Sequence, residues 1–182
     1  MIALALVAAL SLSQACEQGA LPRRPTATAR GDSIMFGYCN TTAPPTLVKA
    51  GLPGGLTGGW VVLNGAIVGE TAPQIRARYV AEEATACVGE RCAYLLLEGG
   101  VNSLRIGNAP AAVLAEMVWV VDDALAKGYG VVWTDVLPYA GNAGSGTDPL
   151  GQATAYNALW AAACAARLLY GAAVSRQLRR IR

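Results

Sequence analysis

The sequence predicts an α/β protein with a mainly parallel sheet of about five strands between helical layers. Three observations lead to this class. Short apolar runs recur along the chain, and they are continuous rather than alternating, which is typical of strands covered on both faces. Stretches with helical spacing separate these runs. Because strands and helices alternate throughout, the connections are those of parallel βαβ units.

Five apolar runs give the expected strands. They are TATAR at residues 26–30, WVVLN at 60–64, AYLLLEGG from Ala93, GVVWTDVLP from Gly130 and GAAV from Gly171. The last run gives the weakest signal.

Three stretches with helical spacing lie between the strands, at residues 71–87, 108–128 and about 152–169. Thr71 and Asn108 are typical N-cap residues at the starts of the first two, and Gly128 is a typical stop signal. In the second stretch, apolar residues recur at intervals of four and predict a stripe that packs on the sheet. These residues are Val113, Met117, Val121 and Leu125.

The length of 182 residues suits one domain with a proper core, which we expect over residues 26–182. Apolar residues make up 54% of the chain and charged residues 14%, which excludes a disordered protein. The formal net charge is +2, but the end SRQLRRIR holds four of the 14 basic residues. The rest of the chain is slightly acidic, so no basic face for nucleic acid is predicted.

The N-terminus has the features of an export signal. Residues 1–15 begin with a ten-residue apolar run that is too short to span a bilayer, and Ser13 and Ala15 are small residues suited to cleavage before Cys16. A cysteine at this point also suggests a lipid anchor, although Ser13 stands where a Leu is usual. We therefore expect a periplasmic, secreted or lipid-anchored protein, with residues 16–25 as a linker. An unprocessed N-terminal helix is the alternative.

The cysteines fit an oxidising compartment. If Cys16 carries a lipid, four remain: Cys39, Cys87, Cys92 and Cys164. Cys87 and Cys92 flank a short turn and are expected to form a disulfide between a helix and the next strand. A zinc site is not expected, because the sequence has no CxxC pair and no His.

Four of the expected strands are followed directly by polar residues and glycines, at the sheet edge where α/β proteins bind ligands. The segments are GDS at 31–33, NGAIVGET at 64–71, EGGVNS at 98–103 and TDVLPY at 134–139. The first three supply the parts of an acyl-transfer site. We expect Ser33 to be the nucleophile, and the amides of Ser33 and Gly69 to form an oxyanion hole with the Asn102 side chain.

The order of these blocks resembles the SGNH hydrolases, also called the GDSL esterase/lipase family, over most of the chain. The first block ends at Ser33, the second runs from Asn64 to Gly69, and the third, Gly-x-Asn, ends at Asn102. Ser103 stands where the family has a final Asp. The resemblance implies a flavodoxin-like three-layer α/β/α sandwich and ester hydrolysis, often deacetylation of carbohydrates or cleavage of lipid or thioester substrates.

The fourth block of the family, Asp-x-x-His, is absent, and the sequence contains no His. In the family this block follows the fifth strand, where this chain runs SRQLRRIR, so we expect the domain to be truncated at its C-terminus. Arg cannot act as a base because it stays protonated. Asp135 and Asp148 are the remaining candidates, and either would need a raised pKa to serve.

The sequence therefore predicts an exported serine ester hydrolase that acts on a small-molecule ester through an acyl-enzyme and is impaired by the missing His. One alternative is a ligand-binding pseudo-hydrolase that kept the pocket and lost the base. The other is an inactive gene fragment. Neither a cofactor nor a metal ion is expected, and contact with a membrane is expected only through a lipid at Cys16.

Overall fold

The computed structural model describes residues 25–37, 42–43, 45–46, 61–86, 91–136, 149–167 and 170–172. The predicted leader, nearly all of the linker, Cys16, Cys39, Cys87 and Asp148 lie outside these residues. Among the residues described, no helix combines the length and apolar character needed for a transmembrane span.

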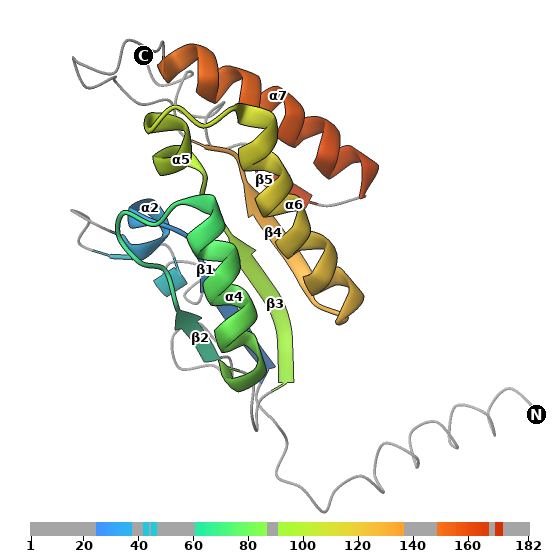
Figure 1. Cartoon of the computed structure of the whole chain (residues 1–182). Coiled ribbons are helices and arrows are strands. Elements are labelled where there is room, and N and C mark those ends of the chain that lie inside the picture. The colour runs from blue at the N-terminus through green and yellow to red at the C-terminus, as the bar shows by residue number, and fades with distance from the viewer. Residues whose placement is uncertain are drawn as a thin grey trace, which may run out of the picture.

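Five strands form one sheet in the order β2-β1-β3-β4-β5. Their bounds are Pro25–Arg30 for β1, Val61–Asn64 for β2, Arg91–Leu97 for β3, Gly130–Thr134 for β4 and Tyr170–Ala172 for β5. All four strand pairs are parallel. This confirms the prediction of a parallel sheet, and Figure 1 shows the strands running side by side with helices along them.

In the described part of the chain, five helices with defined bounds connect the strands or extend from their ends. Their bounds are Ser33–Phe36 for α2, Ala72–Ala86 for α4, Val101–Arg105 for α5, Pro110–Ala126 for α6 and Pro149–Ala166 for α7. The three long helices lie close to the predicted ranges. The short helix α5 was not predicted, because its five residues follow two glycines and read as a loop.

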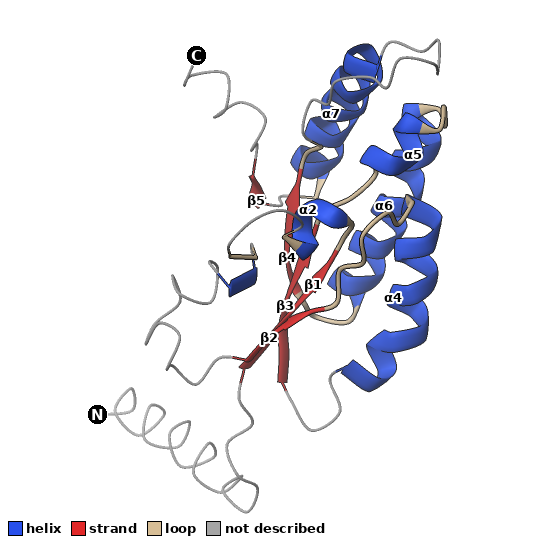
Figure 2. Cartoon of the chain, turned by 90° about the vertical axis from the view of Figure 1, so that its left-hand side faces the viewer, coloured by secondary structure: helices blue, strands red, loops and turns tan. Residues whose placement is uncertain are grey.

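Apolar side chains are buried on both faces of the sheet, so the sheet is the middle layer of a three-layer α/β fold. Leu95 and Leu97 of β3 point into the main core, which α4, α6 and α7 cover on one side of the sheet (Figure 2). Leu96 points the opposite way and packs with Ala29 and with Met35 of α2. The alternation along β3 places one buried set on each face.

The strand order also explains which helices share a face. From β2 onward each connection moves the chain in one direction along the sheet, from β2 across β1 to β3, then to β4 and β5. Because βαβ crossovers are right-handed, α4, α6 and α7 all lie on the same face. The short helix α2, which follows β1, packs on the opposite face through Met35.

The helix starts differ in how they are capped. Gln74 accepts a hydrogen bond from the backbone N–H of Thr71 (2.9 Å), which is half of a capping box at the predicted start of α4. The prediction that Asn108 caps the next helix was wrong. The N-cap is Ala109, which has no side-chain cap bond, and Pro110 occupies the first helical position. Proline suits this position, because its φ angle is already helical and its missing N–H has no partner to lose.

Candidate active site

The three predicted site segments follow neighbouring strands. Ser33 follows β1, Gly69 follows β2, and Asn102 follows β3. Since β1 lies between β2 and β3, all three segments lie at the carboxyl edge of adjacent parallel strands. This is the edge at which open α/β sheets bind ligands.

Ser33 is the first residue of α2 and is partly exposed. Asp32 is the N-cap, and its Oδ1 accepts a hydrogen bond from the backbone N–H of Ile34 (3.0 Å). This bond holds the turn from β1 into α2 and thereby fixes the backbone of Ser33. Within the described residues, the backbone N–H of Ser33 donates no hydrogen bond.

Gly31 allows the strand to turn tightly next to β3. A Cβ at this position would lie 2.7 Å from Cβ of Met35 and 2.8 Å from the carbonyl oxygen of Glu98. Both distances are shorter than real Cβ contacts, and the second neighbour is backbone that cannot rotate away. The glycine of the Gly-Asp-Ser block is therefore needed for the close approach of β1 and Glu98.

The segment from β2 to α4 carries Gly69. Backbone hydrogen bonds from Gly65 to Ala29 (2.9 Å) and from Ile67 to Gly31 (3.0 Å) tie it to the end of β1. Gly69 has a φ of 84°, and open space surrounds the position of its absent side chain. No backbone hydrogen bond from its N–H is found in the part of the chain that the structure describes.

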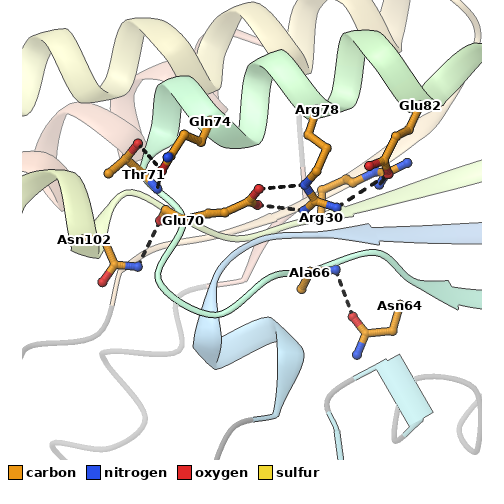
Figure 3. Close-up of polar contacts among 9 residues, drawn as sticks. All are labelled: Arg30, Asn64, Ala66, Glu70, Thr71, Gln74, Arg78, Glu82 and Asn102. Carbon is orange, nitrogen blue, oxygen red and sulfur yellow. Dashed lines mark hydrogen bonds and ion pairs between the residues drawn. The ribbon is translucent and has the colours of Figure 1, made fainter.

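Asn64, the first residue of the second block, has a structural role. Its Oδ1 accepts a hydrogen bond from the N–H of Ala66 (3.2 Å), which closes a turn directly after β2 (Figure 3). Its Nδ2 donates to the carbonyl oxygen of Phe36 at the end of α2 (3.4 Å). Asn64 therefore connects the second block to the helix that begins with Ser33.

Asn102 lies in the first turn of α5 and points toward the Gly69 segment. Its Nδ2 donates a hydrogen bond to the carbonyl oxygen of Glu70 (2.9 Å), the residue that follows Gly69 (Figure 3). The structure thus brings Asn102 and the Gly69 segment together. No hydrogen bond joins Ser33 to Gly69 or Asn102 among the residues described.

Ser103, which replaces the Asp of the family pattern, has a defined partner. It is fully buried, and its Oγ accepts a hydrogen bond from the backbone N–H of Ala72 (2.9 Å). Ala72 is the first residue of α4, and its N–H has no acceptor within the helix. Ser103 therefore ties the start of α4 to α5, so the departure from the pattern leaves this helix start satisfied.

A chain of four alternating charges runs along α4 beside the site (Figure 3). Arg78 pairs twice with Glu70, through Nε to Oε1 and Nη2 to Oε2, both at 2.7 Å. Its Nη1 lies 3.5 Å from Oε2 of Glu82. The same oxygen accepts from Arg30, whose side chain is only 4% exposed. This ion-pair chain, formed by Arg30, Glu82, Arg78 and Glu70, joins the end of β1 to the Gly69 segment.

Asp32 and Glu98 form a buried pair of carboxyl groups beneath Ser33, at 0% and 3% exposure. Burial raises the pKa of Glu98 well above its usual range, and the neighbouring charge of Asp32 raises it further. Burial also raises the pKa of Asp32. Oδ2 of Asp32 and Oε1 of Glu98 have no hydrogen-bond partner within the described structure. One proton on Glu98, donated to Asp32, would satisfy both oxygens.

Of the two residues considered as substitute bases, Asp135 falls within the described residues and follows a strand other than the one that leads to Ser33. Asp135 is buried directly after β4, and β4 is two strand positions from β1, or roughly 10 Å across the sheet. Asp148 lies outside the described residues. Cys164 is buried and its thiol is free, while the predicted Cys87–Cys92 disulfide falls outside the described part of the chain.

The comparisons with known proteins agree with this geometry. No family model matches the sequence, and no curated protein matches it either. Solved structures do match. AlinE4, an SGNH-hydrolase family esterase, superposes with a TM-score of 0.66 at 13% identity, covering 84% of this chain and 77% of that one.

The fold is that of the SGNH hydrolases. A member of the lipolytic G-D-S-L family from Veillonella parvula matches with a TM-score of 0.68 at 14% identity, over 86% of this chain and 81% of that one. TesA matches with a TM-score of 0.64 at 23% identity, over 80% and 76%. At these identities, the SGNH likeness is one of fold.

Sequence reasoning did not single out Glu98, Glu70 or Arg78. A signal for Glu98 was present, because it is a charged residue at the end of the apolar run YLLL and directly precedes two glycines. A buried carboxyl group in such a place needs a partner. Glu70 and Arg78 gave no comparable signal, since their spacing of eight residues spans the start of a helix.

Proposed function

We propose that this chain is the body of an exported serine ester hydrolase of the SGNH type, acting on an acylated carbohydrate or a lipid-like ester. One observation carries the proposal. Three neighbouring strands end in segments that hold a serine at a helix start, a glycine with an unpaired amide and an asparagine bonded beside that glycine. The fold likeness to SGNH-hydrolase esterases supports the proposal.

In the proposed reaction, Oγ of Ser33 attacks the ester carbonyl carbon and the carbonyl oxygen becomes negatively charged. The amides of Ser33 and Gly69 donate to this oxygen. Asn102 contributes a third donor, because its Nδ2 carries two hydrogens and Glu70 takes only one. Collapse of the intermediate releases the alcohol and leaves an acyl group on Ser33. Water then attacks the acyl carbon, and the acid and free Ser33 are released.

The step that these 182 residues do not support is removal of the Ser33 proton. No His is present in the sequence, and a serine hydroxyl is a poor nucleophile without a base. This absence is also the observation that favours the second candidate function, a protein that binds an ester or its product without cleaving it.

The test is to supply the missing base from outside. The full chain and its Ser33→Ala variant are compared on p-nitrophenyl acetate, first alone and then with imidazole. A version extended at the C-terminus by a segment carrying Asp-x-x-His is measured in parallel, with its own Ser33→Ala control. Without a base, we expect the chain to be no more than marginally faster than Ser33→Ala.

With imidazole or the extension, a rate that depends on Ser33 should appear. If neither addition produces such a rate, the hydrolase proposal fails and the binding function is favoured. A large Ser33-dependent rate in the unmodified chain would instead show that another base exists.

A further inference from the structure

Among the described residues, no backbone hydrogen bond holds the Gly69 N–H itself. Gly69 carries no side chain, and a Cβ built there would find no atom within 4 Å. Its position therefore depends on its neighbours. On one side, Ile67 is bonded to Gly31 (3.0 Å). On the other side, the anchor is Glu70.

Glu70 is held at two points. Its backbone carbonyl accepts the hydrogen bond from Asn102 (2.9 Å), and its carboxylate forms the two-pronged pair with Arg78. Exposure is 16% for the Arg78 side chain and 11% for that of Glu70. Salt screens such a partly buried ion pair less than it screens a surface pair. The planar guanidinium of Arg78 also fixes the direction of the Glu70 carboxylate as well as its distance.

The ion-pair chain continues from Arg78 to the strand that precedes Ser33. Arg30 is the last residue of β1, and its guanidinium passes over Gly65 at the start of the Gly69 segment. A Cβ on Gly65 would lie 2.5 Å from Nη1 of Arg30. The ion-pair chain therefore connects the two sides of the site, because Arg30 lies three residues before Ser33 and Glu70 lies one residue after Gly69.

We propose that Arg78 is a positioning residue of this site: by holding the Glu70 carboxylate, it keeps the Glu70 carbonyl against Asn102 and thereby fixes the two oxyanion donors, Gly69 and Asn102, relative to each other. The inference rests on the proposed function, because it assigns Gly69 and Asn102 their roles.

The experiment follows the side-chain amide of Asn102 in ¹H–¹⁵N NMR spectra of the full chain, with its signals assigned by their loss in Asn102→Ala. Arg78→Met removes the guanidinium and keeps most of the aliphatic stem. The matched control is Arg76→Met, on the same helix. Arg76 makes an ion pair of similar length with Glu116 (2.9 Å) and lies over the ring of Trp119, away from the site.

In Arg78→Met, the Asn102 side-chain amide signals should move, and the hydrogen bonded to the Glu70 carbonyl should exchange with water roughly fivefold faster, as expected when a hydrogen bond of ordinary net strength is weakened. Glu70→Gln, which keeps a hydrogen-bonding group but loses the charge, should change the Asn102 signals and the exchange rate in the same direction and to a smaller extent. Arg76→Met should leave them at their wild-type positions.

Unchanged Asn102 signals in Arg78→Met would overturn the proposal, as would equal changes in Arg76→Met. If the pair only added stability, its loss would lower the free energy of unfolding without altering the native Asn102 signals. The readout does not use catalysis. A failure of the hydrolase proposal would therefore appear in the Ser33 assay, and a failure of the positioning proposal would appear in the Asn102 spectra.

Discussion

The backbone N–H of Asp32 donates to Oε2 of Glu98 (3.4 Å), and the two buried carboxyl groups lie at the ends of adjacent strands. Such groups cannot both carry a charge cheaply, since each is desolvated and each repels the other. Burial and the neighbouring Asp32 charge raise the pKa of Glu98 and so favour its protonated form. The pair lies directly beneath the turn that carries Ser33, so its protonation state bears on both stability and the site.

The Asp32–Glu98 pair should make stability depend on pH. Because the folded pKa of Glu98 is raised, its stabilising contribution is fully present below the ordinary pKa of Glu, about 4.3, and is lost as pH rises through the raised value. Glu98→Gln mimics the protonated side chain and should remove this loss. Urea unfolding of both proteins from about pH 4 to pH 8 checks the prediction.

The free energy of unfolding of Glu98→Gln, relative to wild type, should rise with pH. Val132→Ala is a suitable control, because it removes apolar contacts and does not remove a titrating group. It should lower the free energy of unfolding by the same amount at every pH. Parallel curves for wild type and Glu98→Gln would contradict the assignment of the proton to this pair.

Gly31→Ala should destabilise the protein by about 1–3 kcal/mol, the usual cost of forcing extra volume into a packed region. The new methyl group would meet Met35 and the Glu98 carbonyl. Thermal unfolding measures the loss, and Gly107→Ala offers a comparison. Gly107 has open space around it, so the stability lost in Gly107→Ala should come from its φ of 90° alone. Wild-type stability in Gly31→Ala would show that the strand end is looser than described.

Ser103→Ala should cost about 1–2 kcal/mol, because the N–H of Ala72 would lose its acceptor in a buried place. Asn108→Ala, at the position wrongly predicted to be a helix cap, should change stability by no more than about 0.5 kcal/mol. The urea unfolding midpoints of the two variants test this prediction. Equal effects would mean that the hydrogen bond from Ala72 to Ser103 adds nothing.

Asn102→Ala should lower turnover by about 10² to 10³ in a chain supplied with a base, since removal of one oxyanion donor has this effect in serine hydrolases. The measurement is kcat on p-nitrophenyl acetate in the version extended by Asp-x-x-His. The loss should appear in kcat rather than in KM, because the donor acts on charge that develops in the transition state. A change confined to KM would assign Asn102 to substrate binding instead.

A disulfide between Cys87 and Cys92 remains a prediction. Thiol counting in exported protein should give two fewer free thiols before reduction than after it. If the mature protein shows four free thiols without reductant, both the disulfide and the case for export fail.

The fold could be predicted from the sequence because its signals are local. The runs that became β1, β3 and β4 are continuous and apolar and carry much of the core, as with Leu95–Leu97, and the stripe of Val113, Met117 and Val121 is buried in the same core. The Asn108 cap was predicted wrongly, because a typical cap residue two positions before a proline does not fix which residue begins the helix. The short helix α5 was not predicted for a similar reason, since five residues carry no periodic signal.

The site could be predicted only in part. Ser33, Gly69 and Asn102 were singled out because each follows a strand and strand ends are visible in the sequence, and their catalytic roles stay predictions. The ion-pair chain was not, because its members pair across distances of 4, 8 and 52 residues, and no local pattern relates Arg30 to Glu82. The same holds for Asp32 and Glu98, which are 66 residues apart and meet only because β1 and β3 are neighbours in the sheet.

The position of β1 between β2 and β3 has a consequence for how the molecule assembles. The unit β2–α4–β3 cannot pair its own two strands, since it leaves one strand position open between them, and only β1 fills it. The β3 partners of β1 lie far along the chain, so closing that contact costs the entropy of a long loop. β1, the strand that precedes Ser33, therefore pairs with both flanking strands, and the carboxyl edge that carries the candidate site is complete only when β3 is in place.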